Sequence, residues 1–232
     1  MQTSLLLEAG VTRPQAAKLA AYFDLLLDWN SRINLTAITN EHEVITKHFL
    51  DSIAALESNV FFEGASVMDV GSGAGLPGIP LKICQSDLSV TLLDSLAKRV
   101  RFLNTAAEEL GLTGIRAVHA RAEDAGQDAA YRGQFDVCIS RAVANLSTLS
   151  ELCLPFVKVG GYFIAMKGPA ASEEMQAAEN AVRLLGGELE RIVRYEIPST
   201  DLKHNLLVIK KVKNTSTKYP RKAPKPAKDP LK

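Results

Sequence analysis

Glycine alternates with small residues directly after an acidic residue that closes a β-branched apolar run. The residues are Asp69, Gly71, Gly73 and Gly75, followed by Leu76, and residues 71–75 are called the glycine bend below. Because glycine has no Cβ, such a bend lets the backbone approach a bound molecule closely. In open α/β sheets, ligands bind outside the carboxyl ends of the strands, where this bend is expected. The alternative role is a turn that only connects a strand to a helix.

The spacing of these glycines narrows the class of ligand. A dinucleotide-binding motif, GxGxxG, requires a third glycine at the position of Leu76. The leucine argues against tight packing of a pyrophosphate at the helix start, and therefore against an NAD-dependent oxidoreductase. The observed spacing, GxGxG, instead favours an uncharged or cationic derivative of adenosine.

Further polar groups are predicted at the same edge of the sheet. Asp94 closes the second predicted strand, 19 residues after the last glycine of the bend, and an acid at this place accepts hydrogen bonds from ribose hydroxyls. Its alternative role is to place negative charge at the N-terminus of the following helix, beside Ser95 as the cap. Ala122 and Glu123, after the third strand, offer polar groups to an adenine edge. Arg141, after the fourth strand, could pair with Asp69 or Glu123, or hold a carboxylate or a phosphate.

The elements that position these groups follow from hydrophobic periodicity. Up to about residue 62, apolar residues recur at helical spacing, with capping boxes formed by Thr12 with Gln15 and by Asn40 with Glu43. Short β-branched runs then alternate with helical stretches, which is typical of a parallel sheet. Strands are predicted at 66–70, 90–94, 115–119, 135–140, 162–167, 189–197 and 206–211, and helices at 78–85, 97–110, 147–156 and 173–185. The last two strands have no helix between them, so an antiparallel hairpin is expected.

The chain divides into three predicted parts: a helical N-terminal subdomain at 1–62, an α/β domain at 63–212 and a basic, proline-rich tail at 213–232. The 232 residues carry a formal net charge of +1, but the tail alone has seven Lys or Arg against one Asp. Its four prolines and few apolar side chains predict an extended or disordered segment. Such a tail favours a polyanionic partner, although a solubilising terminus has the same composition.

The composition excludes several classes of protein. A hydrophobic fraction of 47% with 23% charged residues excludes a chain that is disordered throughout. No apolar run approaches the roughly 20 residues of a membrane span, and no secretory signal is visible, so a cytoplasmic protein is expected. The three cysteines are widely separated and the four histidines lack ligand spacing, so neither a disulfide framework nor a metal site is expected. No coiled-coil heptads are visible, and a monomer is expected.

Several motifs together resemble the family of ribosomal RNA small subunit methyltransferase G, also called glucose-inhibited division protein B. They are DVGSGAGLPGIPL at 69–81, LDSLAKRVRFL at 93–103, ISRA at 139–142 and shorter matches at 29–30, 34–36, 48, 50–53, 166–168 and 204–210. The resemblance covers about residues 15–212. Ser72 and Ala74 stand where other members have Thr and Pro. Lys47, before the motif histidine, keeps a positive charge but loses bidentate phosphate geometry.

This resemblance implies a fold, a reaction and a set of contacts. The fold is α/β, a seven-stranded Rossmann-like class I methyltransferase domain with a small helical N-terminal layer. The reaction is methyl transfer from S-adenosylmethionine to N7 of guanine 527 in the 16S rRNA of the 30S ribosomal subunit. The cofactor contacts of the family fall on Gly71, Leu76, Ala122, Glu123 and Arg141. Residue type and position alone add Asp69, Gly73, Gly75 and Asp94 to the cofactor site.

Contacts to the RNA substrate are predicted at polar residues outside the cofactor motifs. They are Arg32, Asn34, Lys47, His48, Lys167, Lys203 and His204. For each one alone, a solvated surface charge or a helix cap is the commoner role. The basic tail is expected to add nonspecific attraction to the phosphates.

The residue types agree with attack by guanine N7. Methylation of cytosine C5 requires a cysteine nucleophile, and exocyclic adenine amines are usually held by an Asn/Asp-Pro-Pro-aromatic element; the sequence shows neither motif. N7 has an in-plane lone pair and no proton to lose, so no general base is needed and no catalytic residue is assigned. Two alternatives stay open: a methyltransferase acting on a small molecule or a protein, and a non-catalytic nucleotide-binding assembly protein.

Overall fold

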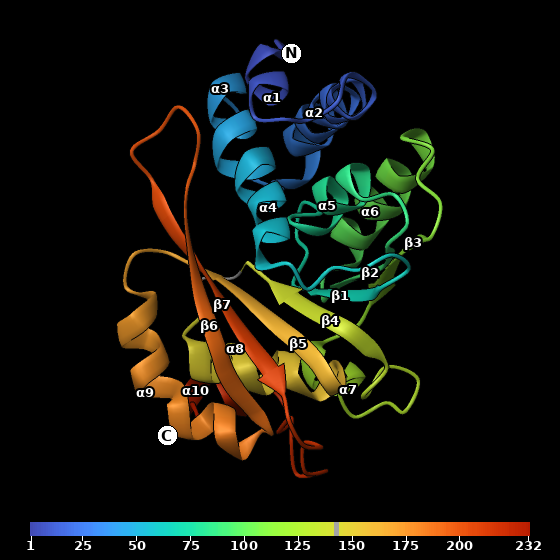
Figure 1. The fold of residues 1–232 in the computed structure, drawn as a ribbon. Helices are drawn as coiled ribbons and strands as arrows, with labels where there is room; N and C mark the ends of the chain where they lie inside the picture. The colour runs from blue at the N-terminus through green and yellow to red at the C-terminus, as the bar shows by residue number, and fades with distance from the viewer. Residues whose placement is uncertain (142–143) are drawn as a thin grey trace.

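The computed structural model describes residues 1–141 and 144–232, and its centre is a seven-stranded sheet (Figure 1). The strands are β1 (Ser66–Val70), β2 (Ser89–Asp94), β3 (Ile115–His119), β4 (Phe135–Ser140), β5 (Val157–Lys167), β6 (Gly187–Glu196) and β7 (Lys203–Lys211). Their order across the sheet is β3-β2-β1-β4-β5-β7-β6. β7 is antiparallel to both of its neighbours and the other pairs are parallel. The predicted α/β sheet and its terminal antiparallel hairpin are confirmed.

The helices are α1 (Ser4–Glu8), α2 (Arg13–Ile33), α3 (Glu41–Glu43), η1 (Val44–Leu50), α4 (Asp51–Ile53), η2 (Ala54–Ser58), α5 (Gly78–Cys84), α6 (Ala97–Glu109), α7 (Ala122–Ala125), α8 (Leu146–Cys153), η3 (Leu154–Phe156), α9 (Ala171–Leu184) and α10 (Lys225–Lys228). Two helices, α2 and α3, begin at the predicted caps Thr12 and Asn40. The amide of Thr12 donates to Gln15 Oε1 (2.9 Å), and Asn40 Oδ1 accepts from the amide of Glu43 (3.2 Å). None of the helices in the two described ranges has the length and apolar content of a membrane span.

Four strands differ from their predicted bounds: β2, β6 and β7 by one to three residues at an end, and β5 by five residues. β5 begins at Val157 instead of residue 162, because Gly160 and Gly161 lie inside the strand. The pairing with β4 shifts register between Phe135 and Val137, which accommodates these glycines as a bulge. A Cβ on Gly161 would lie 2.4 Å from a carbonyl oxygen of β4, so the glycine is required by close backbone approach.

The two faces of the sheet carry separate hydrophobic cores, because alternate residues of a strand point to opposite faces. On β1, Val67 belongs to the core shared with α2, α5 and α6, whereas Met68 belongs to the core shared with α8 and α9. Both side chains are fully buried. A sheet that is covered on both faces leaves its strand ends as the place for polar ligand-binding groups.

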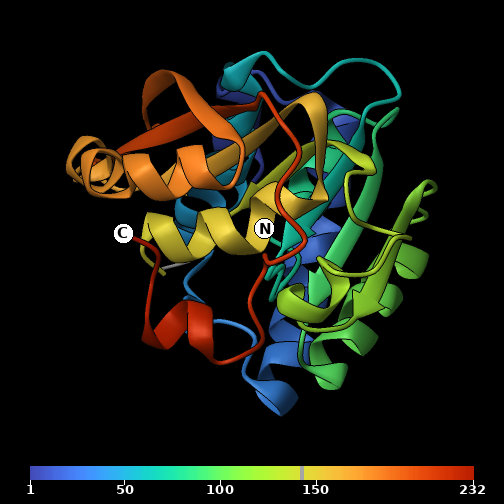
Figure 2. The same cartoon turned by 90° about the horizontal axis from the view of Figure 1, so that it is seen from below.

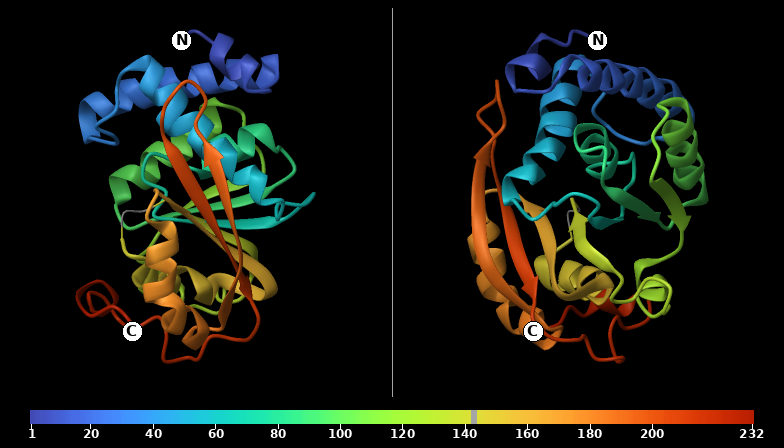
Figure 3. Two further views of the ribbon diagram at one scale, coloured as in Figure 1. Left: turned by 60° about the vertical axis from the view of Figure 1, so that its left-hand side comes forward. Right: turned by 45° about the vertical axis from the view of Figure 1, so that its right-hand side comes forward.

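The N-terminal helices share the first of these cores with the sheet. The ring of Tyr22 in α2 is fully buried and lies 5.4 Å from the ring of Phe49 and 6.4 Å from that of Phe102, measured between centroids. Its hydroxyl donates to the carbonyl of Ala74 in the glycine bend. Both views in Figure 3 place these helices at one end of the molecule and the tail at the other. Residues 1–62 are thus packed as a layer directly on the α/β domain.

The structure places the basic tail against the body, where its composition predicted an extended or disordered segment. Figure 2 shows residues 213–232 (red) running past α8 (yellow). Arg221 pairs with the buried carboxylate of Glu151 (2.7 Å), and the carbonyl of Pro226 accepts from Thr148 Oγ1 (3.0 Å). Pro226 itself is buried. Composition did not predict this packing because it depends on a few specific polar contacts rather than on an apolar run.

Candidate active site

The glycine bend connects β1 to α5 at the carboxyl edge of the sheet. Gly71, Gly73 and Gly75 have φ angles of 75°, 58° and 88°, which residues with a Cβ rarely adopt. The amides of Gly71 and Ser72 donate to the carbonyl of Leu93 on β2, at 2.8 and 3.1 Å. The bend is therefore held against the neighbouring strand in one defined conformation.

The glycines of the bend serve two purposes. A Cβ on Gly71 would meet nothing within 4 Å, and one on Gly73 would meet only a carbonyl oxygen at 3.8 Å. A Cβ on Gly75 would lie 2.4 Å from Ile79 and 2.9 Å from the hydroxyl of Tyr22. The space beside Gly75, which the sequence analysis assigned to the cofactor, is filled by protein, so packing requires this glycine. Leu76 next to it is also buried. The open sides of Gly71 and Gly73 can receive a ligand.

Asp69 lies fully buried beneath the bend. Its Oδ2 accepts from the amide of Gly78 (3.0 Å), whereas its Oδ1 has no hydrogen-bond partner among the described residues. Burial raises the pKa of Asp69 to about 7, although the hydrogen bond from Gly78 works in the opposite direction. A buried carboxyl oxygen without a partner is unfavourable, and a cationic or hydrogen-donating ligand relieves that cost. Asp69 therefore fits a site for a positively charged ligand.

Asp94, predicted to accept from a ribose, is buried at the end of β2, a few residues before α6. Its Oδ1 accepts from the amide of Leu96 and its Oδ2 from the amide of Gly73, both at 2.9 Å. Arg99 lies 3.5 Å from Oδ2. Its negative charge therefore lies just before the first turn of α6, as the alternative role predicted, and the hydrogen bond from Gly73 also ties the glycine bend to β2. The contact of Asp94 with a ribose stays a prediction.

Ala122 and Glu123 begin α7 close to Asp94. The carbonyl of Asp94 accepts from the amide of Ala120 (3.2 Å), which brings the start of α7 to the edge that carries the glycine bend. Both residues are half-buried. The first amides of a helix have no partner within that helix, so these two can donate to a ligand.

A buried carboxylate, Asp51 of α4, joins the ends of three strands. It accepts hydrogen bonds from Arg141 Nη1 (2.9 Å), His204 Nδ1 (2.8 Å) and the hydroxyl of Tyr195 (2.7 Å). Burial opposes ionisation of Asp51, but these hydrogen bonds and the charge of Arg141 hold its pKa below the ordinary value. Burial, reinforced by the charge of Asp51, raises the pKa of Tyr195. The four residues are called the Asp51 cluster below.

Arg141 is oriented by this cluster rather than by the glycine bend. Its guanidinium pairs with Asp51 at 2.9 Å, and it also donates to the carbonyl of Lys47 (3.0 Å). Among the described residues it forms no ion pair with Asp69 or Glu123, so that part of the prediction is wrong. The reason is that the helical segment 41–58 places Asp51 beside the end of β4. The residues around Arg141 in the sequence carry no sign of this distant partner.

A cavity of about 290 Å³ lies beside the Asp51 cluster. It is lined by Asp51, Met166, Gly168, Glu174 and the predicted site residues Arg141, Lys167 and His204. Lys167 is buried, donates to the carbonyl of Ala144 (2.6 Å) and pairs with Glu174 (2.8 Å). The fold thus brings residues from β4, β5 and β7 together at the carboxyl edge. Within residues 1–141 and 144–232, no group of three His, Cys, Asp or Glu is arranged to hold a metal ion.

His48 lies next to the cluster as a neutral side chain. Its Nδ1 is 3.5 Å from Arg141 Nη2, and its Nε2 is 2.8 Å from the hydroxyl of Thr36. Burial, followed by the charge of Arg141, lowers the pKa of His48 to about 4. At neutral pH this imidazole therefore contributes packing and hydrogen bonds but no positive charge for a phosphate.

The other predicted substrate residues have local partners at the surface. Arg32, Lys47 and Lys203 each pair with a carboxylate of their own helix or hairpin. Asn34 follows the end of α2 with a left-handed φ of 52°, and its amide donates to the carbonyl of Asn30 (3.3 Å). The surface and capping roles weighed for these residues are observed, and their contact with RNA stays a prediction.

Comparison with known proteins identifies the family. The family model described as rRNA small subunit methyltransferase G (GidB) matches residues 15–206. The chain belongs to this family. Ribosomal RNA small subunit methyltransferase G of Clostridium botulinum (strain ATCC 19397 / Type A) is 52% identical over 215 residues, which cover 93% of this chain and 90% of that protein. The protein of the same name from Alkaliphilus metalliredigens (strain QYMF) is 52% identical over 218 residues, with coverages of 94% and 91%.

Solved structures at low identity share the fold of this methyltransferase G family member. A SAM-dependent methyltransferase from Aquifex aeolicus has a TM-score of 0.54 at 18% identity, covering 73% of this chain and 93% of its own. The cyclase SpnF has a TM-score of 0.53 at 15% identity, with coverages of 70% and 81%. Since one is named a methyltransferase and the other a cyclase, the fold alone does not decide the reaction.

Sequence analysis missed two residues of the site in this family member. Asp51 had a signal, because it is a charged residue inside an apolar helical run and stands in the motif at 50–53. Tyr195 had none, because its partner Asp51 is 144 positions away in the chain. Ala142, part of the motif at 139–142, lies outside the described residues.

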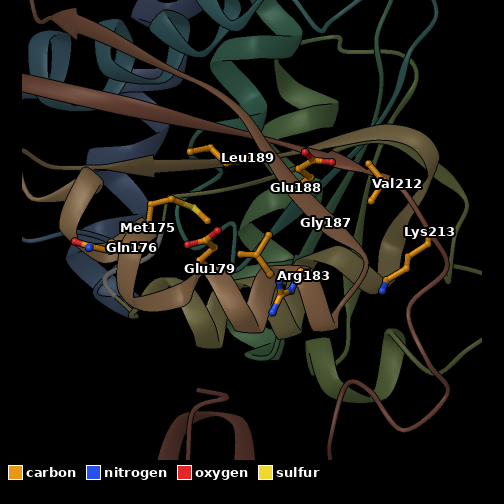
Figure 4. Close-up of a pocket in the computed structure, with 10 residues that line it drawn as sticks. Met175, Gln176, Glu179, Arg183, Gly187, Glu188, Leu189, Val212 and Lys213 are labelled. Carbon is orange, nitrogen blue, oxygen red and sulfur yellow. The ribbon is translucent and has the colours of Figure 1, made fainter.

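A second cavity, of about 660 Å³, lies between α9, the start of β6 and the end of β7 (Figure 4). Met175, Val182 and Leu189 form its apolar wall, and Glu179 and Arg183 are charged residues of its lining. It contains none of the residues predicted to bind the cofactor or the substrate. The assignment of the site therefore stays with the carboxyl edge of the sheet.

Proposed function

We propose that this chain transfers a methyl group from S-adenosylmethionine to N7 of a guanine, position 527, in the 16S rRNA of the small ribosomal subunit. The observation that carries the proposal is the family match over residues 15–206, which includes the glycine bend, Asp94 and Arg141. Relatives at 52% identity that carry the name ribosomal RNA small subunit methyltransferase G support it.

The glycine bend and the neighbouring strand ends would hold the methyl donor. When bound, S-adenosylmethionine supplies a methyl carbon that a cationic sulfur makes electrophilic. The open sides of Gly71 and Gly73 fit close approach of the backbone, and the unpartnered oxygen of Asp69 fits a positive charge. Asp94 and Glu123, at the ends of the adjacent elements, would contact the ribose and the adenine.

The cavity beside the Asp51 cluster would receive the target nucleotide. A regular RNA helix hides guanine N7 in a deep, narrow groove, so the base must be unstacked and held. Arg141 and Lys167 supply positive charge for a phosphate, and Asp51 fixes the orientation of Arg141. N7 uses its in-plane lone pair and loses no proton, so alignment is the main requirement on the protein.

The proposal extends to the setting in which the chain works. The substrate is the rRNA of the small subunit, and the protein acts as a monomer in the cytoplasm. The reaction at N7 requires no metal ion and no general base. The excess of positive charge on the tail supports a polyanionic substrate.

Transfer of labelled methyl groups to small ribosomal subunits, followed by mapping of the modified nucleotide by mass spectrometry, tests the proposal. We expect one methyl group at N7 of guanine 527, and no labelling of subunits that already carry this modification. Labelling of a small molecule or a protein, but not of rRNA, would favour a different methyltransferase. Cofactor binding in calorimetry without transfer to any of these would favour a non-catalytic assembly protein.

A further inference from the structure

The basic tail is a charged surface to which the proposed function assigns no defined contact with the RNA. Its exposed lysines are Lys213, Lys218, Lys222, Lys225, Lys228 and Lys232. Among the described residues, none of their ammonium groups donates a hydrogen bond or pairs with a carboxylate. Every lysine of residues 1–212 except Lys98, by contrast, donates to an acceptor or pairs with a carboxylate. Lysine ammonium groups without a partner are therefore concentrated on the tail, although four arginines of the described body, Arg13, Arg101, Arg121 and Arg194, also lack one.

The tail is held in a defined position by buried groups of the body. The carboxylate of Glu151 is fully buried and accepts three hydrogen bonds from the guanidinium of Arg221, at 2.8, 3.1 and 2.7 Å. Thr148, also buried, donates to the carbonyl of Pro226. Arg132 donates to four carbonyl oxygens, three of them in the tail. A tail that served only to increase solubility would need no buried acid to hold it.

The contacts between the tail and the body are distributed along α8, and those nearer the C-terminus of the chain lie closer to the candidate active site. Arg221 contacts Glu151 in the second half of α8, and Pro226 contacts Thr148 in its first turn. Because α8 follows β4 in the chain, its first turn lies at the carboxyl edge of the sheet, where Arg141 also lies. Helix α10 is therefore packed at the end of α8 that is closer to the cavity of the Asp51 cluster.

Four of the six lysines consequently fall into two groups. Lys225 and Lys228 belong to α10, and a spacing of three residues places them on neighbouring positions of the helical turn. Lys213 lies two residues after β7, and the antiparallel direction of β7 makes it end at the opposite, amino edge of the sheet. Lys218 is also near that edge, since Arg132, which precedes β4, donates to the carbonyls on both sides of it.

We propose that Lys225 and Lys228 form a second RNA-contact surface, which binds backbone phosphates of the strand that presents the target guanine. The inference rests on the proposed function. Lysine contacts to phosphates supply affinity that depends on salt and not on sequence, because each contact releases counterions. The cavity would hold the target nucleotide, and α10 would keep the flanking RNA strand at the carboxyl edge of the sheet.

The matched double variants Lys225→Gln/Lys228→Gln and Lys213→Gln/Lys218→Gln test the proposal. Both remove two exposed, unpaired charges from the same tail, so circular dichroism should show the wild-type fold for both. Their affinities for small-subunit rRNA are measured by filter binding at several salt concentrations. Loss of two phosphate contacts lowers the slope of log K against log salt by about 1.4, so affinity falls about sevenfold less between 50 and 200 mM salt. We expect this change only in the α10 variant, with a raised KM and an unchanged kcat.

Three results would overturn the inference or separate it from the proposed function. An unchanged salt slope in the α10 variant shows that these lysines are only solvated or serve an acidic protein surface. Equal losses in both variants show that the tail acts as diffuse charge without a defined contact. If the wild-type chain transfers no methyl group to rRNA, the proposed function fails, but the binding measurement needs no transfer and still decides whether α10 contacts RNA.

Discussion

At the scale of single residues, Asp51 shows how one buried carboxylate can organise a site. Its three donors, Arg141, Tyr195 and His204, come from the ends of three different strands. A buried charge is tolerated only when it is paired and hydrogen-bonded, so the carboxylate and its donors hold one another in place. In the proposed reaction Asp51 is a positioning residue that acts through Arg141 and His204.

Asp51→Asn should lower kcat for methyl transfer to small subunits about 100-fold, because a displacement of about 1 Å in a positioned group can cost this factor. The matched control is Glu63→Gln, which removes an exposed acid on the loop before β1 and should leave kcat unchanged. Both enzymes are assayed at saturating S-adenosylmethionine. Full kcat in the Asp51→Asn enzyme would refute the positioning role.

Asp69 should give the ligand-free protein a characteristic pH dependence. The pKa of an Asp in an unfolded chain is about 3.9, whereas burial raises the pKa of Asp69 to about 7 in the folded protein. Between these values the folded state binds more protons than the unfolded state. The contribution of Asp69 to stability is therefore fully present below about pH 4 and is lost as the pH rises to about 7.

Asp69→Asn should remove this dependence. Relative to the wild type, the free energy of unfolding of the variant should increase by about 4 kcal/mol between pH 4 and pH 7.5, and the difference should then stay level. His48, whose pKa is lowered to about 4, has the opposite effect in this range, but it is present in both proteins and cancels. Urea denaturation at a series of pH values gives the difference, and a difference that is independent of pH would contradict the assignment.

At the scale of elements, the glycine bend combines a packed side with an open side. Gly75 is enclosed by Ile79 and by Tyr22, which comes from the N-terminal layer. Gly73 has only a distant carbonyl near its missing Cβ, and its amide is bonded to Asp94. The bend therefore serves as a junction between two layers and as the proposed cofactor surface.

Alanine substitutions at these two glycines should separate the two roles. Gly75→Ala combines left-handed strain of about 1 kcal/mol or more with overpacking against Ile79, so it should destabilise the fold by about 3 kcal/mol. Gly73→Ala has the strain without the clash and should cost about 1 kcal/mol, but it should weaken binding of S-adenosylmethionine. Urea denaturation and calorimetry measure the two effects. Equal stability losses at the two positions would disprove the distinction.

At the scale of the whole molecule, the N-terminal helices and the α/β domain depend on one core. Leu19, Leu26 and Phe49 from the N-terminal layer are fully buried in the same cluster as Ile79 and Phe102. Burial of each side chain of this size stabilises the fold by about 1.5–3 kcal/mol. The burial of a few such side chains contributes as much free energy as the whole stability of a typical domain, which is about 5–15 kcal/mol.

Residues 63–232 alone should therefore lack a cooperative thermal transition. The truncated chain would expose the apolar surface of α5 and α6 that α2 covers, and the part of β5, β6 and β7 that η2 covers. The control is the full chain, which retains this core together with the buried Glu151–Arg221 pair and should unfold cooperatively. Far-UV circular dichroism during heating compares the two, and a sharp transition in the shorter chain would show that the α/β domain folds independently.

The sequence by itself determined the features that depend on neighbouring residues. The alternation of strands and helices, the antiparallel hairpin, the caps at Thr12 and Asn40 and the position of the glycine bend were all predicted correctly. Each of them depends on periodicity, turn chemistry or capping within a short stretch of chain. The family motifs also indicated Arg141, Lys167 and His204, which line one cavity.

Only the tertiary structure decided which distant groups meet. The partner of Arg141 is Asp51, 90 positions away, and the partner of Arg221 is Glu151, 70 positions away. The packed role of Gly75 depends in the same way on Tyr22 of the N-terminal layer. Such pairs form because sheet order and helix packing bring elements together, and no local pattern of residue types contains that information.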